Sequence, residues 1–295
     1  MNNSILLPNV PLTTCQDFQD YWDQWHKEWY KKSSAWIAAR YTPTSTDSIL
    51  GWPIPNNEVW KDFPEPYWGN PCNPKAVFIN INPAGGGGDL TLTNPINPAN
   101  TLYSLYLAND GIYSKTITDL GNQNVIYPSA VSWHKRRARW TSEILGINPP
   151  LKVNAILDLD LVPWHTIKGA QMNAYLNRPG VCELIMNKII IPAIYISNTV
   201  NPVSVFSKNI IGRGLQIQNV ISLPCFNPLF VPPILTFPKP LSTRDRWNMN
   251  QLNFGIVNAK LKVYIGGYGG MALPGPGEIF LNGGVRITTR DILAL

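Results

Sequence analysis

The chain has 295 residues, of which 44% are hydrophobic and 14% are charged. This balance indicates a globular protein with a substantial core and excludes an intrinsically disordered chain. The net charge of +6 permits a polyanionic partner without requiring one, and no apolar run reaches the length of a membrane span. Because the N-terminus lacks a basic-then-apolar leader, we expect a cytoplasmic protein that does not contact a membrane.

The first predicted element is a helix over residues 16–37. Its aromatic residues recur at steps of three, four or seven and therefore form one stripe: Phe18, Trp22, Trp25, Trp29 and Trp36. We prefer a helix packed on the core over an aromatic binding surface. Residues 42–75 are rich in Pro, Asn and Trp and predict an irregular, ordered segment. We expect residues 1–60 to pack on a domain formed by residues 61–295, so that the chain is a single domain.

The cysteines lie far apart along the chain and form no Cys-x-x-Cys pair: Cys15, Cys72, Cys182 and Cys225. Zinc sites and disulfide frameworks usually have a characteristic spacing, which this chain lacks. We therefore predict reduced, mostly buried thiols and no metal site.

Apolar, β-branched runs follow at 76–81, 154–162 and 189–197, and two more at 215–223 and 260–267. Dozens of residues separate the first three, which favours a parallel sheet covered by helices. We predict an α/β fold, a three-layer α/β/α sandwich around a central, mostly parallel sheet of four to five strands. The part after about residue 236 either completes this sheet or forms an accessory extension. Ligands of such sheets bind beyond the carboxyl ends of the strands, so we place candidate site residues there.

The first run ends in Asn80-Ile81-Asn82-Pro83-Ala84, and four glycines follow at 85–88. Pro83 restricts Asn82 to an extended conformation, which projects its side chain from the strand tip. A carboxamide can donate and accept at once, so Asn82 could hold a water or the edge of a base. Equally, it could cap a turn. A Walker loop is excluded because no Lys-Ser/Thr follows the glycines.

The second run ends in "DLDLVPWHT", residues 158–166. An Asp inside a parallel strand must be paired or lie near the strand end. Pro163 breaks the strand register, so Trp164 and His165 belong to the following loop. Together they offer a stacking face and a titratable donor. His165 could instead cap a backbone carbonyl, but its place at the predicted ligand edge favours a functional role.

Between these runs lies a basic segment, "SWHKRRARW", residues 132–140. It contains Lys135, Arg136, Arg137 and Arg139, with no acid among them and aromatic residues on both sides. Basic residues interleaved with aromatic ones suit a phosphate backbone and unstacked bases. The alternative is a solvated helix face.

Three of these segments resemble the uracil-DNA glycosylase superfamily. "NINPAG" at 80–85 is similar to the Gly-Ile-Asn-Pro-Gly motif of its mismatch-specific and single-strand-selective branches, with Asn80 and Ala84 replacing the glycines. "PEPYWGNP" at 64–71 resembles the lead-in of uncharacterised bacterial members, and "LVPWHT" resembles a Pro-aromatic-His segment after their second strand. The resemblance covers about residues 60–230. The second family motif has no clean copy, and the loops at 226–230 and 266–274 both remain candidates for its place.

The resemblance implies a monofunctional DNA glycosylase that hydrolyses the bond between deoxyribose and a flipped-out base through an oxocarbenium-like state. Asn82 would position the water or read the base, and His165 would donate to the leaving base. The base pocket would consist of Tyr67, Trp68, Pro83, Ala84, Gly85 and Trp164. The DNA contacts would come from Lys135, Arg136, Arg137, Arg139 and Tyr268. Neither a metal, a cofactor nor an obligate protein partner is implied.

Strict uracil enzymes of this superfamily place a bulky aromatic residue after the motif's proline. Here that position is Ala84, followed by glycines. We hypothesise that the loop accommodates a large 5-substituent, such as that of hydroxymethylated or glucosylated cytosine in phage DNA, and that the enzyme serves antiviral defence. The alternatives are a uracil or mismatch repair glycosylase, a non-catalytic nucleic-acid-binding module with the same fold, and an enzyme that binds a small nucleotide or sugar phosphate at the glycine run.

Overall fold

The structure is a computed structural model. It describes residues 9–55, 58–80, 102–122, 128–165, 174–200, 203–206, 247–254, 259–266, 279–282 and 285–288. Its helices are α1 (Cys15–Ala38), α2 (Leu102–Ala108), α3 (Tyr113–Asn122), α4 (Pro128–Leu145), α6 (Val181–Ile185) and α7 (Ile191–Val200). Two short 3-10 helices, η2 (Glu58–Lys61) and η3 (Val153–Ala155), and one turn of π-helix, η4 (Met186–Ile190), complete the helical elements described.

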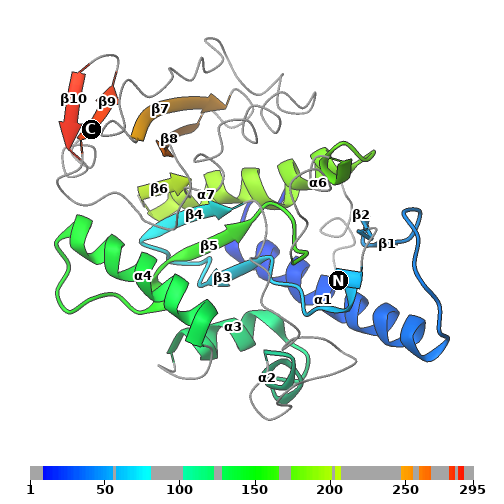
Figure 1. The fold of residues 1–295 in the computed structure, drawn as a ribbon. Helices are drawn as coiled ribbons and strands as arrows, with labels where there is room; N and C mark the ends of the chain where they lie inside the picture. The colour runs from blue at the N-terminus through cyan, green and yellow to red at the C-terminus, as the bar shows by residue number, and fades with distance from the viewer. Residues whose placement is uncertain are drawn as a thin grey trace.

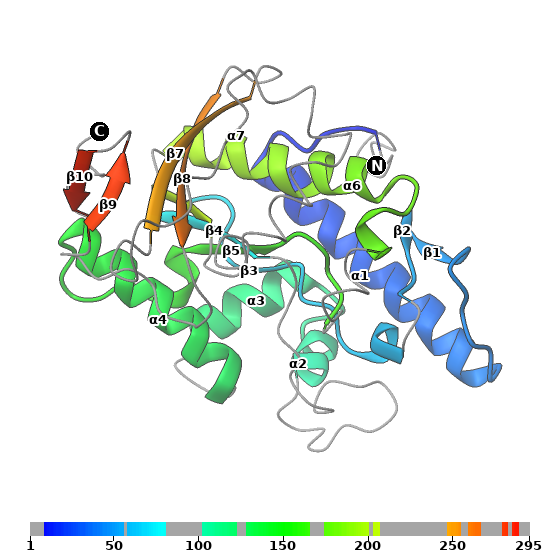
Figure 2. The same ribbon diagram turned by 45° about the horizontal axis from the view of Figure 1, so that its top comes forward.

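The central sheet has four strands in the order β3-β5-β4-β6. They are β3 (Tyr67–Gly69), β5 (Leu157–Asp160), β4 (Ala76–Asn80) and β6 (Val203–Phe206). β4 runs parallel to both β5 and β6, whereas β3 pairs with β5 in the antiparallel direction. In Figures 1 and 2, α7 runs along one side of this sheet and α4 along the other. The chain is therefore an α/β protein with a mixed sheet, and the strands predicted at 76–81 and 154–162 are confirmed.

The C-terminal strands form a second four-stranded sheet, in the order β10-β9-β7-β8. They are β7 (Trp247–Phe254), β8 (Ala259–Gly266), β9 (Ile279–Asn282) and β10 (Val285–Thr288). The apolar run at 260–267 corresponds to β8, which pairs antiparallel with β7. This run therefore belongs to a separate sheet and does not extend the central one. A further pair, β1 (Ser48–Ile49) and β2 (Trp52–Pro53), lies in the irregular segment after α1.

The strand predicted at 189–197 is wrong, because these residues are helical. They span the end of η4 and most of α7. Ile189, Ile190 and Ile191 are all buried, and a short uninterrupted apolar run of this kind occurs in a buried helical segment as well as in a central strand. Pro192 lies inside the continuous helical stretch that α6, η4 and α7 form, directly after the π-helical turn η4, where the regular α-helical hydrogen-bond pattern is already interrupted.

Helix α1 confirms the prediction for residues 16–37. Thr14 caps its N-terminus by accepting a hydrogen bond from the backbone N–H of Asp17 at 3.0 Å. The aromatic stripe is in the core: Phe18, Trp22, Trp25 and Trp29 are all buried, and Trp36 packs against the same cluster. The buried indole of Trp25 donates to the carbonyl of Ile49 at 3.1 Å, which satisfies its polar atom.

Cys15 and Cys72 form a disulfide, so the prediction of reduced thiols is wrong for this pair, and none of the described cysteines is free. Cys15 is the first residue of α1, and Cys72 lies in the turn between β3 and β4. Packing of α1 against β3, with Phe18 and Tyr67 ring centroids 4.9 Å apart, brings the two together. Cys-x-x-Cys spacing cannot reveal a pair made by tertiary packing. Disulfides are rare in the cytosol, so this one weighs against the expected cytoplasmic location.

Within the described residues, no helix has the length and apolar character that a membrane crossing requires.

Candidate functional site

The carboxyl ends of β4 and β5 lie side by side. The two strands are parallel, and their last residues, Asn80 and Asp160, are register partners. The chain segments that leave the two strands therefore start at the same edge of the sheet, as the sequence predicts. Most of the first segment, with Asn82, Pro83, Ala84 and Gly85, lies outside the described residues, and so does Tyr268. The second segment, which leads to His165, is described.

The segment before β3 holds the residues after β5 by backbone hydrogen bonds. The N–H of Asp160 donates to the carbonyl of Pro66 at 2.9 Å, and the N–H of Glu65 donates to the carbonyl of Pro163 at 3.1 Å. This places the Glu65 side chain beside His165, with 3.2 Å between Glu65 Oε1 and His165 Nε2. His165 is 3% exposed. The described partner of His165 is therefore the buried carboxylate of Glu65.

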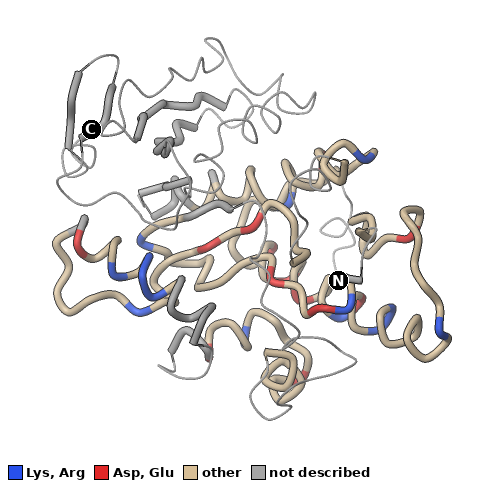
Figure 3. The backbone as a smooth tube through the Cα atoms, in the orientation of Figure 1, with Lys and Arg blue, Asp and Glu red and all other residues tan. Residues whose placement is uncertain are grey.

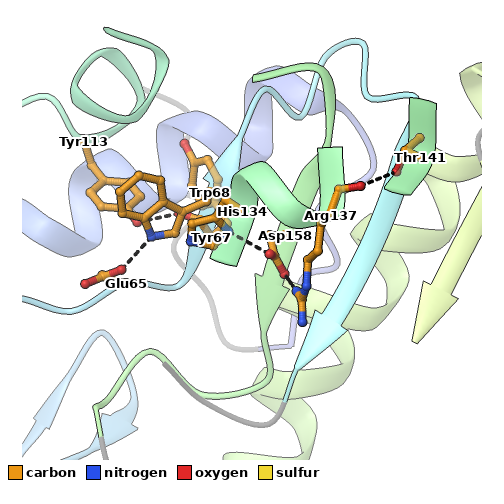
Figure 4. A network of polar contacts seen from close by, with 8 residues as sticks. All are labelled: Glu65, Tyr67, Trp68, Tyr113, His134, Arg137, Thr141 and Asp158. Atoms are coloured by element: carbon orange, nitrogen blue, oxygen red, sulfur yellow. Dashed lines mark hydrogen bonds and ion pairs between the residues drawn. The ribbon is translucent and has the colours of Figure 1, made fainter. Parts of the chain in front are cut away.

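A second histidine is bound to the middle of β5. Trp68 of β3 and Asp158 of β5 are register partners, so both side chains are on one face of the sheet. His134 and Arg137 are three residues apart on α4 and reach this face together. His134 Nδ1 is 2.7 Å from one oxygen of Asp158, and Arg137 Nη1 pairs with the other oxygen (Figure 4).

Trp68 connects the two carboxylates. Its ring stacks on His134, with centroids 4.5 Å apart and planes 21° from parallel. Its indole Nε1 donates to Glu65 Oε2 at 2.5 Å, as Figure 4 shows. The result is one buried polar network that runs from His165 through Glu65, Trp68 and His134 to Asp158.

Electrostatics favour the ionised form of Glu65. Burial by itself raises the pKa of Glu65, but the hydrogen bond and charge of His165, the Trp68 N–H and the charge of His134 together hold that pKa below its usual value. Burial lowers the pKa of Arg137, and the neighbouring carboxylates of Asp158 and Asp160 act in the opposite direction. The buried ion pair of Arg137 and Asp158 stabilises the fold only while both residues are present, because removal of one would leave the other as an unpaired buried charge.

The third histidine, His26 of α1, lies on the other side of the same segment. Its ring stacks on Tyr113 at 3.7 Å, and its two nitrogens are 2.7 Å from the carbonyl of Trp22 and 2.9 Å from that of Pro64. Burial lowers its pKa to about 4, although both carbonyls and Glu65 oppose this. The chain has only three histidines, and all are buried beside or near residues 64–65. Sequence reasoning missed Glu65, His134 and His26; the scarcity of histidine was the available signal.

The rings predicted to stack on a flipped base are core residues in this structure, which corrects their expected exposure. Tyr67, Trp68 and Trp164 are each at most 2% exposed. Trp164 packs edge-to-face on Trp25, and its Nε1 donates to the hydroxyl of Tyr175 at 2.8 Å. Trp68 already has a stacking partner in His134. A loop position predicted from Pro163 did not imply exposure, because the aromatic face of α1 covers Trp164.

The basic segment divides between the two faces of α4. Lys135, Arg136 and Arg139 are exposed, and Arg139 makes a surface ion pair with Glu143 at 3.1 Å. The expected DNA contact of Arg137 is not possible in this structure, because its side chain is 2% exposed and paired with Asp158. Figure 3 shows basic residues along this helix. The helical period accounts for the division, since residues 134, 137, 138 and 141 share the buried face.

Comparison with known proteins finds no match: no family model, no curated protein and no solved structure is significantly similar to the chain. Among the residues that the structure describes, no group of three or more His, Cys, Asp or Glu side chains is arranged to hold a metal ion.

Proposed function

We propose that the chain is a monofunctional DNA glycosylase of the uracil-DNA glycosylase superfamily, with a three-layer α/β/α core. The supporting observation is the parallel register of β4 and β5, which pairs Asn80 with Asp160. Asn80 is the first residue of "NINPAG", and Asp160 directly precedes "LVPWHT". These are two of the segments that resemble the superfamily, and they are far apart in the sequence. A single catalytic site requires its segments to lie at one edge of the sheet, and these two segments both start there.

The proposed reaction is hydrolysis. The bond between deoxyribose C1′ and the base nitrogen breaks, and its electron pair leaves with the base. A water oxygen bonds to C1′ and releases a proton, and the base takes up a proton. In this proposal the carboxamide of Asn82 orients the water, and His165 donates to the departing base. Removal of a comparable donor at other active sites costs about 2.7–4 kcal/mol of transition-state stabilisation.

The proposed substrate is a cytosine with a large 5-substituent in phage DNA, because a small residue, Ala84, and four glycines follow Pro83. Ala84→Phe tests this proposal directly. A phenyl ring at this position should abolish release of glucosylated or hydroxymethylated cytosine and leave any release of uracil intact. A wild-type enzyme that acts on uracil alone would contradict the substrate proposal and leave a repair glycosylase.

The decisive experiment measures base release. Wild type, Asn82→Ala and Asn73→Ala are incubated with uracil-containing DNA and with phage DNA that carries modified cytosines, and freed base and alkali-labile sites are counted. Asn73 is the matched control, since it is also an Asn before Pro but is exposed in the turn after β3. Asn82→Ala should reduce release by about 100-fold or more, and Asn73→Ala should behave as wild type.

A second candidate is a non-catalytic nucleic-acid-binding module. The burial of Tyr67, Trp68 and Trp164 favours it, because these rings are not exposed to stack on a base in this structure. It predicts DNA binding that weakens with salt and no base release from any substrate. Binding without release by wild type would therefore replace the glycosylase with this module.

A further inference from the structure

An exposed basic surface lies beside the starts of the parallel strands β4 and β5. Residues 70–75 and 132–156, which lead into these strands, contain a single acid, Glu143. Five of their cations are exposed, and we call these five the basic surface: Lys75, Lys135, Arg136, Arg139 and Lys152. Figure 3 shows basic residues along α4 and in the segments that lead into β4 and β5. Five exposed cations against one exposed acid leave an excess of four positive charges.

Backbone hydrogen bonds bring the segments of the basic surface together. The N–H of Lys75 donates to the carbonyl of Ala155 at 2.6 Å, and the N–H of Ala155 donates to the carbonyl of Lys152 at 3.0 Å. The N–H of Leu151 donates to the hydroxyl of Ser142 on α4 at 2.7 Å. Lys75 and Lys152 therefore adjoin the C-terminal half of α4.

The direction of α4 places the basic surface toward one edge of the central sheet. His134, in the first half of α4, contacts Asp158 inside β5, whereas Ser142, near the end of α4, contacts the segment before β5. The helix therefore runs antiparallel to β5, and the basic surface extends to the amino ends of β4 and β5. "NINPAG" and "LVPWHT" start at the carboxyl ends of these strands, which are at the opposite edge.

The chemistry of the basic surface fits phosphate groups and does not fit unstacked bases. Among the described residues, the exposed large hydrophobic side chains are Tyr41, Leu107 and Tyr195, and none of them belongs to these segments. Trp140, which follows Arg139, is buried. Proteins that bind single strands combine basic residues with accessible aromatic rings, on which the bases stack. Cations without such rings suit the phosphates of a duplex, whose bases stack on one another.

We propose that Lys75, Lys152 and the exposed cations of α4 bind the phosphate backbone of duplex DNA. This adds the starts of β4 and β5 to the DNA contacts expected for α4, and the choice of DNA as the polyanion rests on the proposed function. Phosphate contacts position a protein on a duplex without reading its sequence. Because the surface lies at the opposite edge from "NINPAG" and "LVPWHT", it holds a part of the duplex from which no base is released.

The first test measures binding of a labelled, unmodified DNA duplex by fluorescence anisotropy at several salt concentrations. Lys75→Gln/Lys152→Gln should lower the slope of log affinity against log salt by about 1.8, since each lost phosphate contact removes about 0.9. Affinity in about 0.1 M salt should fall by about tenfold or more. Lys75 contacts Ala155 through its backbone, and the side chain of Lys152 does not cap η3, so the variant should keep the wild-type unfolding curve.

Lys27→Gln/Lys31→Gln is the matched control, because it removes the same charge from exposed positions on α1, which Figures 1 and 2 show apart from α4. Its affinity and slope should stay close to those of wild type. An unchanged slope in Lys75→Gln/Lys152→Gln, or equal losses in the two double variants, would overturn the proposal. A single strand of the same length that competes better than the duplex would also overturn it.

The second test uses the unmodified protein. Limited acetylation followed by mass spectrometry measures the reactivity of each lysine with and without the unmodified duplex. The duplex should reduce acetylation of Lys75 and Lys152 several-fold and leave Lys27 and Lys31 unchanged. Equal reactivity of Lys75 and Lys152 with and without the duplex would overturn the proposal.

These tests separate the basic surface from the glycosylase, because neither of them measures base release. If wild type binds the duplex through Lys75 and Lys152 but releases no base from any DNA, the surface stands and the glycosylase is wrong. If wild type releases base while Lys75→Gln/Lys152→Gln binds the duplex as wild type does, the glycosylase stands and the proposed surface is wrong.

Discussion

The Asp158–His134 pair and the Glu65–His165 pair use the same side-chain types a short distance apart in one network, and they differ in how their charge is balanced. Asp158 also binds Arg137, whose guanidinium stays charged at any ordinary pH. Glu65 has no guanidinium partner among its described contacts and instead accepts from the neutral indole of Trp68. The first pair is therefore compensated permanently, whereas compensation of the second depends on a proton held by histidine.

The largest expected effect is the loss of the permanent compensation. Arg137→Met keeps the length and apolar bulk of the side chain but removes the guanidinium that pairs with Asp158. The free energy of unfolding should fall by about 3–5 kcal/mol, because a buried charge loses its partner. Urea unfolding followed by tryptophan fluorescence measures the change.

Arg136→Met is the matched control, one residue away on the exposed face of α4. Its unfolding free energy should stay within about 0.5 kcal/mol of wild type. Equal losses in both variants would show that the two faces of α4 do not differ as described.

Acid should destabilise the fold through His26, the histidine next to this network. His26 has a folded-state pKa of about 4, below the value of about 6.5 in an unfolded chain. The unfolded state therefore takes up the proton first, and stability should fall by roughly 3 kcal/mol as pH drops from 6.5 to 4. Glu65 acts in the same direction at lower pH, since its folded-state pKa is also depressed.

His26→Phe checks this assignment, because a phenyl ring can still stack on Tyr113 but does not titrate. Its unfolding free energy, measured by urea titration at several pH values, should depend less on pH between 6.5 and 4 than that of wild type. An equal dependence would assign the acid sensitivity to other groups.

The disulfide should stabilise the region that carries both pairs. Cys15 and Cys72 are 57 residues apart, so the bond restricts a long loop of the unfolded chain. The double variant Cys15→Ser, Cys72→Ser should lose about 2–4 kcal/mol of unfolding free energy. Wild type in reducing agent should lose at least as much. The double variant should lose less on reduction than wild type does, and what it does lose comes from Cys182, which is also disulfide-bonded. A reductant-insensitive wild type would contradict the pairing.

The smallest effect on folding is expected on the outer face of α4. Neutralising Lys135, Arg136 and Arg139 together to Gln should change the unfolding free energy by less than about 1 kcal/mol, because their side chains are exposed. If this face binds DNA, the slope of log affinity against log salt should fall by about 2–3. An unchanged slope would remove α4 from the proposed DNA contacts.

Periodicity in the sequence predicted what local chemistry controls. The aromatic stripe of α1 at every third or fourth residue and the apolar strand at 76–81 both have the predicted structure. The prediction for 189–197 was wrong because an uninterrupted apolar run has no periodicity, so that a largely buried helical segment has the same pattern as a central strand. The predicted parallel pairing of the runs at 76–81 and 154–162 is confirmed. The sequence could therefore predict that the carboxyl ends of these two strands lie at the same edge of the sheet.

The sequence could not predict which side chains from distant segments pair with one another. Nothing local in "SWHKRRARW" distinguishes Arg137 from its neighbours; its burial depends on where α4 lies against Asp158. Likewise Cys15 meets Cys72, and Glu65 meets His165, only because α1, the segment before β3 and the end of β5 pack together. The sequence by itself determined the aromatic helix at 16–37, the two parallel strands at 76–81 and 154–162, and the residue types at their ends. Tertiary structure alone decided which charges are paired, because pairing depends on distance in space, which no spacing along the chain encodes.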